Sequence, residues 1–438
     1  MRQIFTVALA YVGVLVGAGL SSGQDLLQYF LSFGRKGILG VLLLGALNVF
    51  FGRVIITLGC YYQSKSHQDV LKEISHPVSN RIIDLTLVLA SFVMGFVMVA
   101  GAGANLKQQF GLPFWAGTLL CSLLIFLVSF LDFEKITAVL GIFTPLIIGI
   151  ICFTSFYIIF FTPHNYEAIE ASAHTIRPAI PNLFLSVINY FTLCAMTGVS
   201  MAFVLGGSLV RITVAERGGL LGGALVGLII VMAALTLYFR LDSVVDAEIP
   251  MLTIMHDFSP VLSFFYAFII FALIFNTAFS LYYATARRFA GTDPKKMRIF
   301  MGGITLAGFL CSFGGFKTLV GILYPVLGYM GIFMLLILFV AWIRERDNII
   351  LEKFIRRKML RIALKKHDSD ADLTKKDRML FRKLSETSAA DTSTIKQRVL
   401  KIADDIAARH DDLHDYAATH LPIDPDALNR ISLDDRTR

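Results

Sequence analysis

A run of glycine, serine and acidic residues interrupts the first apolar segment of the chain, which extends from about residue 4 to residue 33. The run reads Val16-Gly17-Ala18-Gly19-Leu20-Ser21-Ser22-Gly23-Gln24-Asp25. Each glycine in a helix interior costs roughly 1 kcal/mol relative to alanine, so the run predicts a break in the helix. Inside a membrane, such a break persists only where protein or a wet cavity satisfies the opened backbone. The run therefore predicts a polar site within the membrane.

The two halves of the broken helix offer binding groups of opposite sign. The half that ends near Gly17 leaves carbonyl oxygens that suit a cation, and the half that begins near Ser21 presents N–H groups that suit an anion. Asp25 adds a carboxylate near the bilayer midplane, where ionisable residues are costly and usually functional. Many secondary transporters build their substrate site at such a break. The alternative is that the glycines, which recur at four-residue spacing, serve only close helix packing.

Two later apolar segments carry polar residues that could complete the site. The segment at 183–209 contains Asn189 and Tyr190, and its helix is interrupted by the polar run from Thr197 to Ser200. The segment at 259–285 carries Asn276, Thr277 and Ser280, of which the last two share a helical face. These hydroxyl and amide groups could bind a small cation opposite the carbonyls of segment 1. The alternative is hydrogen bonding between helices or to the preceding turn.

These patterns define two sets of candidate site residues. The predicted substrate-binding residues are Gly17, Gly19, Ser21, Ser22, Gly23, Asp25, Asn189, Tyr190, Thr197 and Ser200. The predicted ion-binding residues are Val16, Gly17, Asn276, Thr277 and Ser280. Neither a catalytic constellation nor a cysteine–histidine cluster with metal-ligand spacing is present in the sequence, so we expect no enzyme, no metal site and no cofactor other than Na+ or H+ as coupling ion.

The composition is that of a polytopic membrane protein. The 438 residues are 56% hydrophobic, and the mean hydropathy is +0.68. Ten apolar segments lie at about 4–33, 37–62, 82–104, 114–131, 136–161, 183–209, 218–240, 259–285, 298–313 and 317–343. Lys and Arg are more frequent in the loops that share a side with the termini, which predicts a plasma-membrane protein with both termini cytoplasmic. The net charge is +8, and a cluster of Lys and Arg without Asp or Glu lies at 353–366 in the C-terminal tail; this pattern favours lipid contact over nucleic-acid binding.

The membrane part repeats itself. Gly141-Ile-Phe-Thr-Pro145 in segment 5 recurs as Gly321-Ile-Leu-Tyr-Pro325 in segment 10. Nearly the same distance in sequence separates the start of segment 2 from that of segment 7, and the polar run in segment 1 from that in segment 6. Because each repeat has an odd number of segments, the halves must be inverted. The predicted fold is all-α, with two inverted five-helix repeats and broken helices 1 and 6. The predicted units are 1–161, an extracellular connection at 162–182, 183–343, and a helical tail at 344–438.

Three further patterns predict the contacts of segment 7 and of the C-terminal tail. Glycines at four-residue spacing in segment 7, from Gly218 to Gly227, predict close helix packing. Residues 353–366 are basic and amphipathic, and we expect them to lie on anionic lipids of the inner leaflet. In the tail, Ile395, Val399, Ile402 and Ile406 form an apolar stripe that predicts contact with the body or with a partner helix.

The motif in segment 1 resembles that of the YkvI-type membrane proteins of the amino acid–polyamine–organocation superfamily. The similar residues are Tyr11-Val-Gly13 and Gly17-Ala-Gly19-Leu-Ser-Ser-Gly23-Gln24-Asp25, and the resemblance covers roughly residues 1–343. It implies a LeuT-like fold with a central site between segments 1, 3, 6 and 8. Asp25 stands where this family tends to have Glu. Sodium-coupled relatives place adjacent hydroxyl residues in segment 8, whereas Thr277 and Ser280 are not adjacent.

Together these observations predict a secondary active transporter that moves a small amino-acid-like or amine solute by alternating access, coupled to Na+ or H+. One alternative is a non-transporting receptor of the same fold that signals through the tail. Another is a channel, which would favour a continuous pore with side-chain rings over broken helices at a midplane site.

Overall fold

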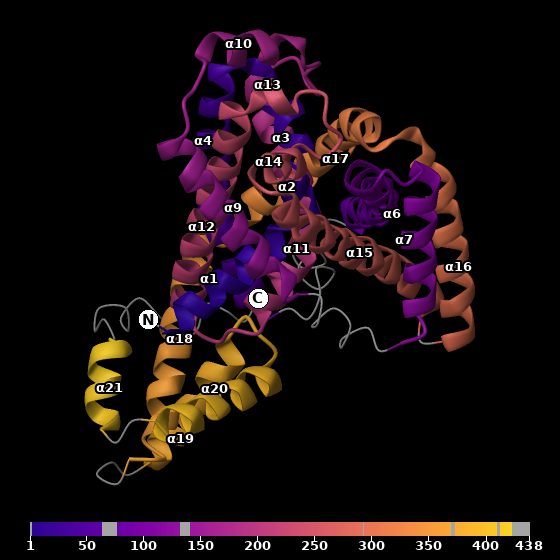
Figure 1. Ribbon diagram of the computed structural model, residues 1–438. Coiled ribbons are helices and arrows are strands. Elements are labelled where there is room, and N and C mark those ends of the chain that lie inside the picture. The colour runs from indigo at the N-terminus through magenta and orange to yellow at the C-terminus, as the bar shows by residue number, and fades with distance from the viewer. Residues whose placement is uncertain are drawn as a thin grey trace.

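The computed structural model describes residues 2–63, 77–131, 141–291, 293–368, 373–409 and 412–422, and the described part is helical, without a β-strand (Figure 1). Eight helices in this part are long and apolar enough to cross a membrane. They are α4 (Arg35–Tyr62), α6 (Pro77–Phe110), α9 (Phe143–Phe161), α11 (Leu183–Gly207), α12 (Ile212–Phe239), α15 (Pro260–Ala290), α16 (Pro294–Cys311) and α17 (Phe316–Arg344). The shorter apolar helices α1 (Arg2–Leu15) and α7 (Phe114–Val128) lie in predicted segments 1 and 4. The all-helical, multi-pass architecture is confirmed, and the count of ten crossings stays a prediction.

Segment 1 is broken where the glycines predict. After α1, the backbone is extended at Gly17 (φ −121°), and the chain continues as α2 (Ala18–Ser22), α3 (Gln24–Tyr29) and the 3-10 turn η1 (Leu31–Phe33). Gly23 separates α2 from α3 in the left-handed conformation, with φ of 77°. A Cβ atom at this position would lie 2.9 Å from Leu237 Cδ1, so both backbone and space favour glycine here.

Segment 6 is not broken, and the prediction of a second interrupted helix is wrong. Helix α11 runs continuously from Leu183 to Gly207. Its hydroxyl groups return to carbonyls of the preceding turn, as Thr197 Oγ1 does by donating to Cys194 O at 2.9 Å, and such bonds leave the helix intact. Gly198 serves close packing, since a Cβ atom there would lie 2.6 Å from Leu15 Cδ2 of α1.

Helices that are equivalent in the two predicted repeats pack in reciprocal pairs. Helix α4 packs on its equivalent α12, α6 packs on α15, and α7 packs on α16. The pair α1 and α12 has its counterpart in the pair α11 and α4. A twofold axis between inverted repeats produces this pattern. In Figure 1, α4 and α12 lie to the left, α6, α7, α15 and α16 lie to the right, and the short helices α2 and α3 lie between the two groups.

Glycines bring α4 and α12 into backbone contact. A Cβ atom on Gly227 would lie 2.9 Å from Gly45 Cα, and one on Gly223 would lie 2.1 Å from Asn48 O. Either atom would separate the helices, because backbone cannot turn away as a flexible side chain can. The prediction of close packing for the segment 7 glycines is therefore confirmed, and this interface forms a rigid wall beside the broken helix.

The loops on the far side of the bundle from the tail also contain short helices. These are α10 (Tyr166–Thr175), α13 (Leu241–Val244) and α14 (Pro250–Phe258), and α14 contacts both α2 and α15. Glu170 of α10 accepts hydrogen bonds from the Arg35 backbone N–H at 2.9 Å and from the Tyr238 hydroxyl at 2.7 Å. This carboxylate thus joins the start of α4 to the end of α12 above the broken helix.

The tail folds into four helices at one end of the bundle (Figure 1): α18 (Arg346–Leu364), α19 (Lys375–Thr387), α20 (Thr392–Ala407) and α21 (Leu413–His420). The predicted stripe on α20 packs within this tail, where Ile395, Val399 and Ile406 are buried in one apolar cluster with residues of α18. Of the two predicted contacts, with the body or with a partner helix, the structure shows the second, and α18 is that helix. Asp391 caps α20, and hydrogen bonds from Ser393 and Thr394 lower the pKa of its carboxyl group to about 2, so the cap stays charged at neutral pH.

Residues 353–366 bury their apolar side against protein, and contact of their basic side with anionic lipids stays a prediction. They belong to α18, whose apolar residues Ile355, Met359 and Leu360 are buried against other tail helices. A basic amphipathic pattern does not by itself distinguish a protein partner of the apolar side from a membrane surface. Its basic residues have protein partners too: Lys353 Nζ lies 2.6 Å from Glu216 Oε2, at the start of α12.

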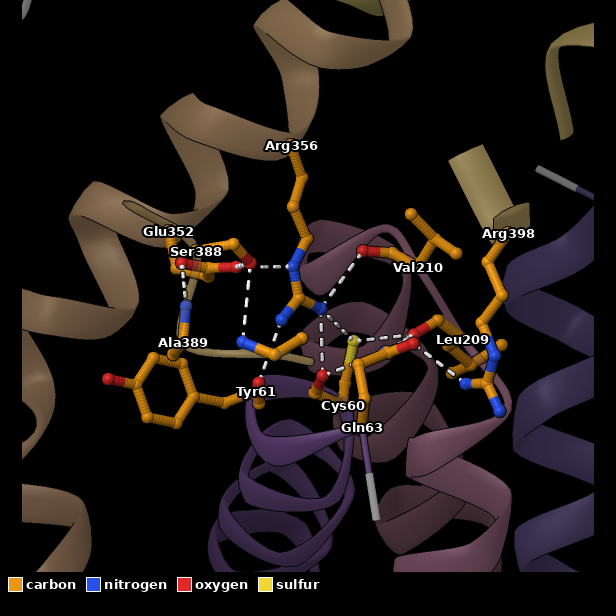
Figure 2. A network of polar contacts seen from close by, with 11 residues as sticks. Cys60, Tyr61, Gln63, Leu209, Val210, Glu352, Arg356, Ser388, Ala389 and Arg398 are labelled. Carbon is orange, nitrogen blue, oxygen red and sulfur yellow. Dashed lines mark hydrogen bonds and ion pairs between the residues drawn. The ribbon is translucent and has the colours of Figure 1, made fainter. Parts of the chain in front are cut away.

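A buried arginine ties α18 to the end of α4, as Figure 2 shows. Arg356 is 2% exposed, and its Nε donates to Glu352 Oε1 at 2.7 Å. Its two terminal nitrogens donate to Cys60 O at 2.8 Å and to Tyr61 O at 2.7 Å. These carbonyls belong to the last turn of α4, where the helix dipole favours a cation.

A second arginine reinforces this attachment. Arg398 of α20 donates to Gln63 Oε1 at 2.7 Å and also to Gly207 O, at the end of α11. We call Glu352, Arg356 and Arg398 the tail clamp. The clamp holds the ends of α4 and α11 to each other and to the tail.

Candidate functional site

Asp25 lies at the centre of the candidate site, in the first turn of α3. Its side chain is 4% exposed, and its Oδ2 accepts a hydrogen bond of 2.5 Å from the Tyr190 hydroxyl of α11. Its Oδ1 accepts the Leu26 N–H at 3.0 Å. Gly19 faces the same carboxylate, since a Cβ atom there would lie 3.3 Å from Oδ2. The fold thus brings together three of the predicted substrate-binding residues: Gly19, Asp25 and Tyr190.

The opened backbone of the break is satisfied mainly by the two serines of the motif. Ser21 Oγ donates to Gly17 O at 3.0 Å, and Ser22 Oγ donates to Gly19 O at 2.9 Å. The Tyr266 hydroxyl of α15 donates to Ser21 O at 3.0 Å. The serines therefore stabilise the break itself. Tyr266 was not predicted, because a lone tyrosine in an apolar segment has no spacing that links it to a site.

The predicted ion-binding residues lie on the two elements expected to face each other. Helix α2 packs against α15, and a Cβ atom on Gly17 would lie 4.0 Å from Thr277 Oγ1. Asn276 Oδ1 has no hydrogen-bond partner, while Thr277 and Ser280 are half-buried on the same helix. Val16 is buried beside the break. Within the described residues there is no group of three His, Cys, Asp or Glu side chains that could hold a metal ion.

Two predicted residues of α11 serve helix packing. Asn189 Oδ1 accepts a hydrogen bond from the Tyr29 hydroxyl at 3.2 Å, and its Nδ2 donates to Pro325 O of α17 at 2.9 Å. Asn189 therefore joins α3, α11 and α17 rather than facing an open site. Thr197 donates within its own helix, and Ser200 lies about one turn further along, half-buried.

The carboxylate of Asp25 has hydrogen-bond donors but no cationic partner among the described residues: no Lys, Arg or His lies within ion-pair distance. A buried carboxylate is costly unless it is neutralised or paired. The arrangement therefore suits a ligand that brings positive charge, such as an ammonium group, a metal cation or a proton.

Burial around the site differs between its two sides. On the far side from the tail, Tyr29, Phe30 and Leu31 are fully buried, and the Tyr29 and Phe30 rings lie 5.0 and 5.4 Å from the Tyr190 ring, centre to centre. Nearer the tail, Gly17 and Thr277 are half-buried. Fully buried aromatic residues thus cover the site on the far side.

Comparisons with known proteins agree with this geometry. No model of a known protein family matches the chain. The uncharacterized membrane protein YkvI of Bacillus subtilis (strain 168) is 25% identical over 329 residues, which are 74% of this chain and 92% of that protein. The uncharacterized protein YyaD of the same organism is 26% identical over 338 residues, 75% of this chain and 94% of its own length.

Two solved structures share the fold. MhsT in complex with L-phenylalanine has a TM-score of 0.54 and 15% identity, covering 92% of this chain and 98% of its own. A mutant of the Eremococcus coleocola manganese transporter has a TM-score of 0.51 and 14% identity, covering 93% and 94%. The resemblance that the motif of segment 1 carries is therefore confirmed: this is a multi-pass membrane protein with a LeuT-like fold, similar to the YkvI-type proteins.

Proposed function

We propose that the protein is a secondary active transporter that moves a small amino-acid-like or amine solute across the plasma membrane by alternating access. The observation that carries the proposal is the buried carboxylate of Asp25, which lies beside a broken helix and has no cationic partner in the described part of the chain. Discontinuous helices with polar groups at the midplane are typical of substrate sites in such transporters. The tail side is then cytoplasmic, and the coupling ion is Na+ or H+.

The fold and the burial pattern support this proposal. The two solved structures of similar fold are a manganese transporter and a protein that holds L-phenylalanine. Alternating access requires groups that can cover the site from one side, and Tyr29, Phe30 and Leu31 form such a cover on the far side. The buried Asp25 beside the broken helix suits the binding of a cationic group, which is the role that a transporter requires.

Counterflow into proteoliposomes tests the proposal. Vesicles containing the full chain are loaded with unlabelled L-amino acids and polyamines, and uptake of each labelled solute is then measured against protein-free vesicles. We expect accumulation of at least one amino acid or amine that disappears when the unlabelled solute is omitted. Saturable binding of a solute without any flux would instead support the receptor, for which the attachment of the tail to α4 and α11 is the favouring observation.

The cation site between α2 and α15 is tested in the same vesicles. Thr277→Val and Asn276→Leu each remove an oxygen that faces the break or lacks a partner, at a cost of about 1.4 kcal/mol of cation binding. The Na+ concentration, or the proton concentration, at half-maximal uptake should therefore rise about tenfold. Thr285→Val is the control, because the Thr285 hydroxyl donates to Leu281 O within the same helix, away from the break. An unchanged cation dependence in both test variants would reject the site.

A further inference from the structure

Gln24 is buried beside Asp25 and makes no side-chain hydrogen bond. Its side chain is 0% exposed, and neither Nε2 nor Oε1 has a partner. Among the buried side chains of the described residues, no other has two such atoms. Nearly all buried polar groups in proteins are hydrogen-bonded, so an amide without any partner requires an explanation.

The geometry of α3 and α17 places a second unpartnered group opposite Gln24. Gln28 Nε2 donates to Lys317 O at 3.0 Å, and a Cβ atom on Gly321 would lie 3.0 Å from Gln28 Oε1. Gln24 lies one turn before Gln28 on the same face of α3. Segments 1 and 10 are predicted to cross the membrane in opposite directions, which would bring Gln24 level with Tyr324, one turn after Gly321.

Tyr324 is 2% exposed, and its hydroxyl has no partner either. It precedes Pro325, whose carbonyl oxygen accepts the hydrogen bond from Asn189 Nδ2, and the neighbouring Tyr190 donates to Asp25. Gln24 and Tyr324 thus offer unused hydrogen-bond donors in the neighbourhood of the Asp25 carboxylate. Structural packing does not account for this set, since leaving buried donors unpaired only weakens the folded state. Groups that weaken the fold and lie beside a candidate site are more typical of ligand binding.

We propose that Gln24 and Tyr324 bind a carboxyl oxygen of the solute while its ammonium group lies at Asp25. The proposal rests on the proposed function and narrows it, because a simple amine has no oxygen to accept the two hydrogen bonds. The transported solute is then amino-acid-like, with an ammonium and a carboxylate in the same molecule. Gln24 and Tyr324 are the residues that distinguish it from an amine of the same shape.

Matched pairs of probes test this directly. The purified full chain is heated with increasing concentrations of each L-amino acid or of its decarboxylated amine, for example L-phenylalanine and phenethylamine. The rise of the thermal unfolding midpoint with ligand concentration gives the apparent affinity. The wild type should bind at least one amino acid tenfold or more tightly than its amine. Gln24→Met and Tyr324→Phe should reduce that ratio to below about threefold. Both variants should also raise the midpoint without ligand, by about 2 °C, since each removes an unpaired polar group.

Two control variants separate binding from folding. Gln28→Met makes the same change one turn away, but it removes a hydrogen bond, so it should lower the midpoint without ligand and leave the ratio unchanged. Tyr282→Phe removes another unpartnered buried hydroxyl, packed beside Gly308 in a different part of the protein, and should also leave the ratio unchanged.

The outcomes distinguish the inference from the function on which it rests. Equal affinity of the wild type for amino acid and amine would overturn the inference and leave a transporter of amines. An unchanged ratio in Gln24→Met and Tyr324→Phe would also overturn it, because other groups would then bind the carboxyl oxygen. Absence of binding and of counterflow for every probe would overturn both.

Discussion

Asp25→Asn should reduce solute uptake at least tenfold while the protein still folds and reaches the membrane. Asparagine has nearly the same shape: its carbonyl oxygen can accept the Leu26 N–H, and its amide nitrogen can donate to the Tyr190 hydroxyl oxygen instead of accepting from it. What it removes is the negative charge in a buried site. If a cationic group of the solute or a coupling ion pairs with that charge, breaking the pair on one side costs about 3–5 kcal/mol. Counterflow in proteoliposomes measures the effect.

Asp25→Glu should keep partial uptake, because it retains the charge and the family that the chain resembles tends to carry Glu at this position. Asp242→Asn is the matched control, since Asp242 also lies in the first turn of a short helix but is exposed. Near-normal uptake by Asp25→Asn would show that the carboxylate only orients α3, which would leave the backbone of the break and its neighbours as the binding groups.

Arg356→Met should release the tail from the membrane part. The variant leaves Glu352, which is 0% exposed, without the cation that it pairs with among the described residues, and an unpaired buried charge costs about 3–5 kcal/mol. It also removes the hydrogen bonds to the carbonyls of Cys60 and Tyr61. Local opening should therefore become more frequent by about a hundredfold or more, and chymotrypsin should cleave the tail of the purified protein faster by a similar factor.

Arg382→Met provides the comparison for this experiment. Arg382 pairs with Glu386 on the same tail, but the two side chains are 78% and 54% exposed, so the pair contributes little. Glu352→Gln combined with Arg356→Met should recover part of the protection, because the glutamine can still accept the Ala389 N–H without carrying a charge. Equal cleavage rates for Arg356→Met and Arg382→Met would show that the clamp does not hold the tail.

The sequence predicts those features that follow from one segment alone. The break in segment 1 is predictable because the three glycines from Gly17 to Gly23 destabilise a continuous helix. The close packing of segment 7 is predictable from the spacing of its glycines. The continuity of α11 was not predictable in the same way. Threonine and serine in an apolar helix can either mark an opened turn or bond back to the preceding one, and residue type does not decide between the two.

Contacts between distant segments determine the rest, and residue type alone indicates them poorly. Asp25 and Tyr190 are 165 residues apart in the sequence, and neither segment contains a pattern that predicts contact with the other. Gln24 was part of the motif, yet only its burial without partners makes it a candidate binding residue. Arg356 lies in a basic run that is typical of a solvated surface, and its burial depends on carbonyls contributed by α4.

The tail clamp also has a consequence for biosynthesis. Arg356 is made 296 residues after Cys60, whose carbonyl it binds, and after the whole of α17. While the ribosome is still translating the membrane helices, the last turn of α4 lacks the Arg356 guanidinium that caps it in the finished protein. A nascent chain that has inserted all of its apolar segments therefore still differs from the finished protein at this surface. Docking of the tail is the step that marks completion, so a quality-control protease or chaperone that recognises an uncapped helix end could tell the two apart.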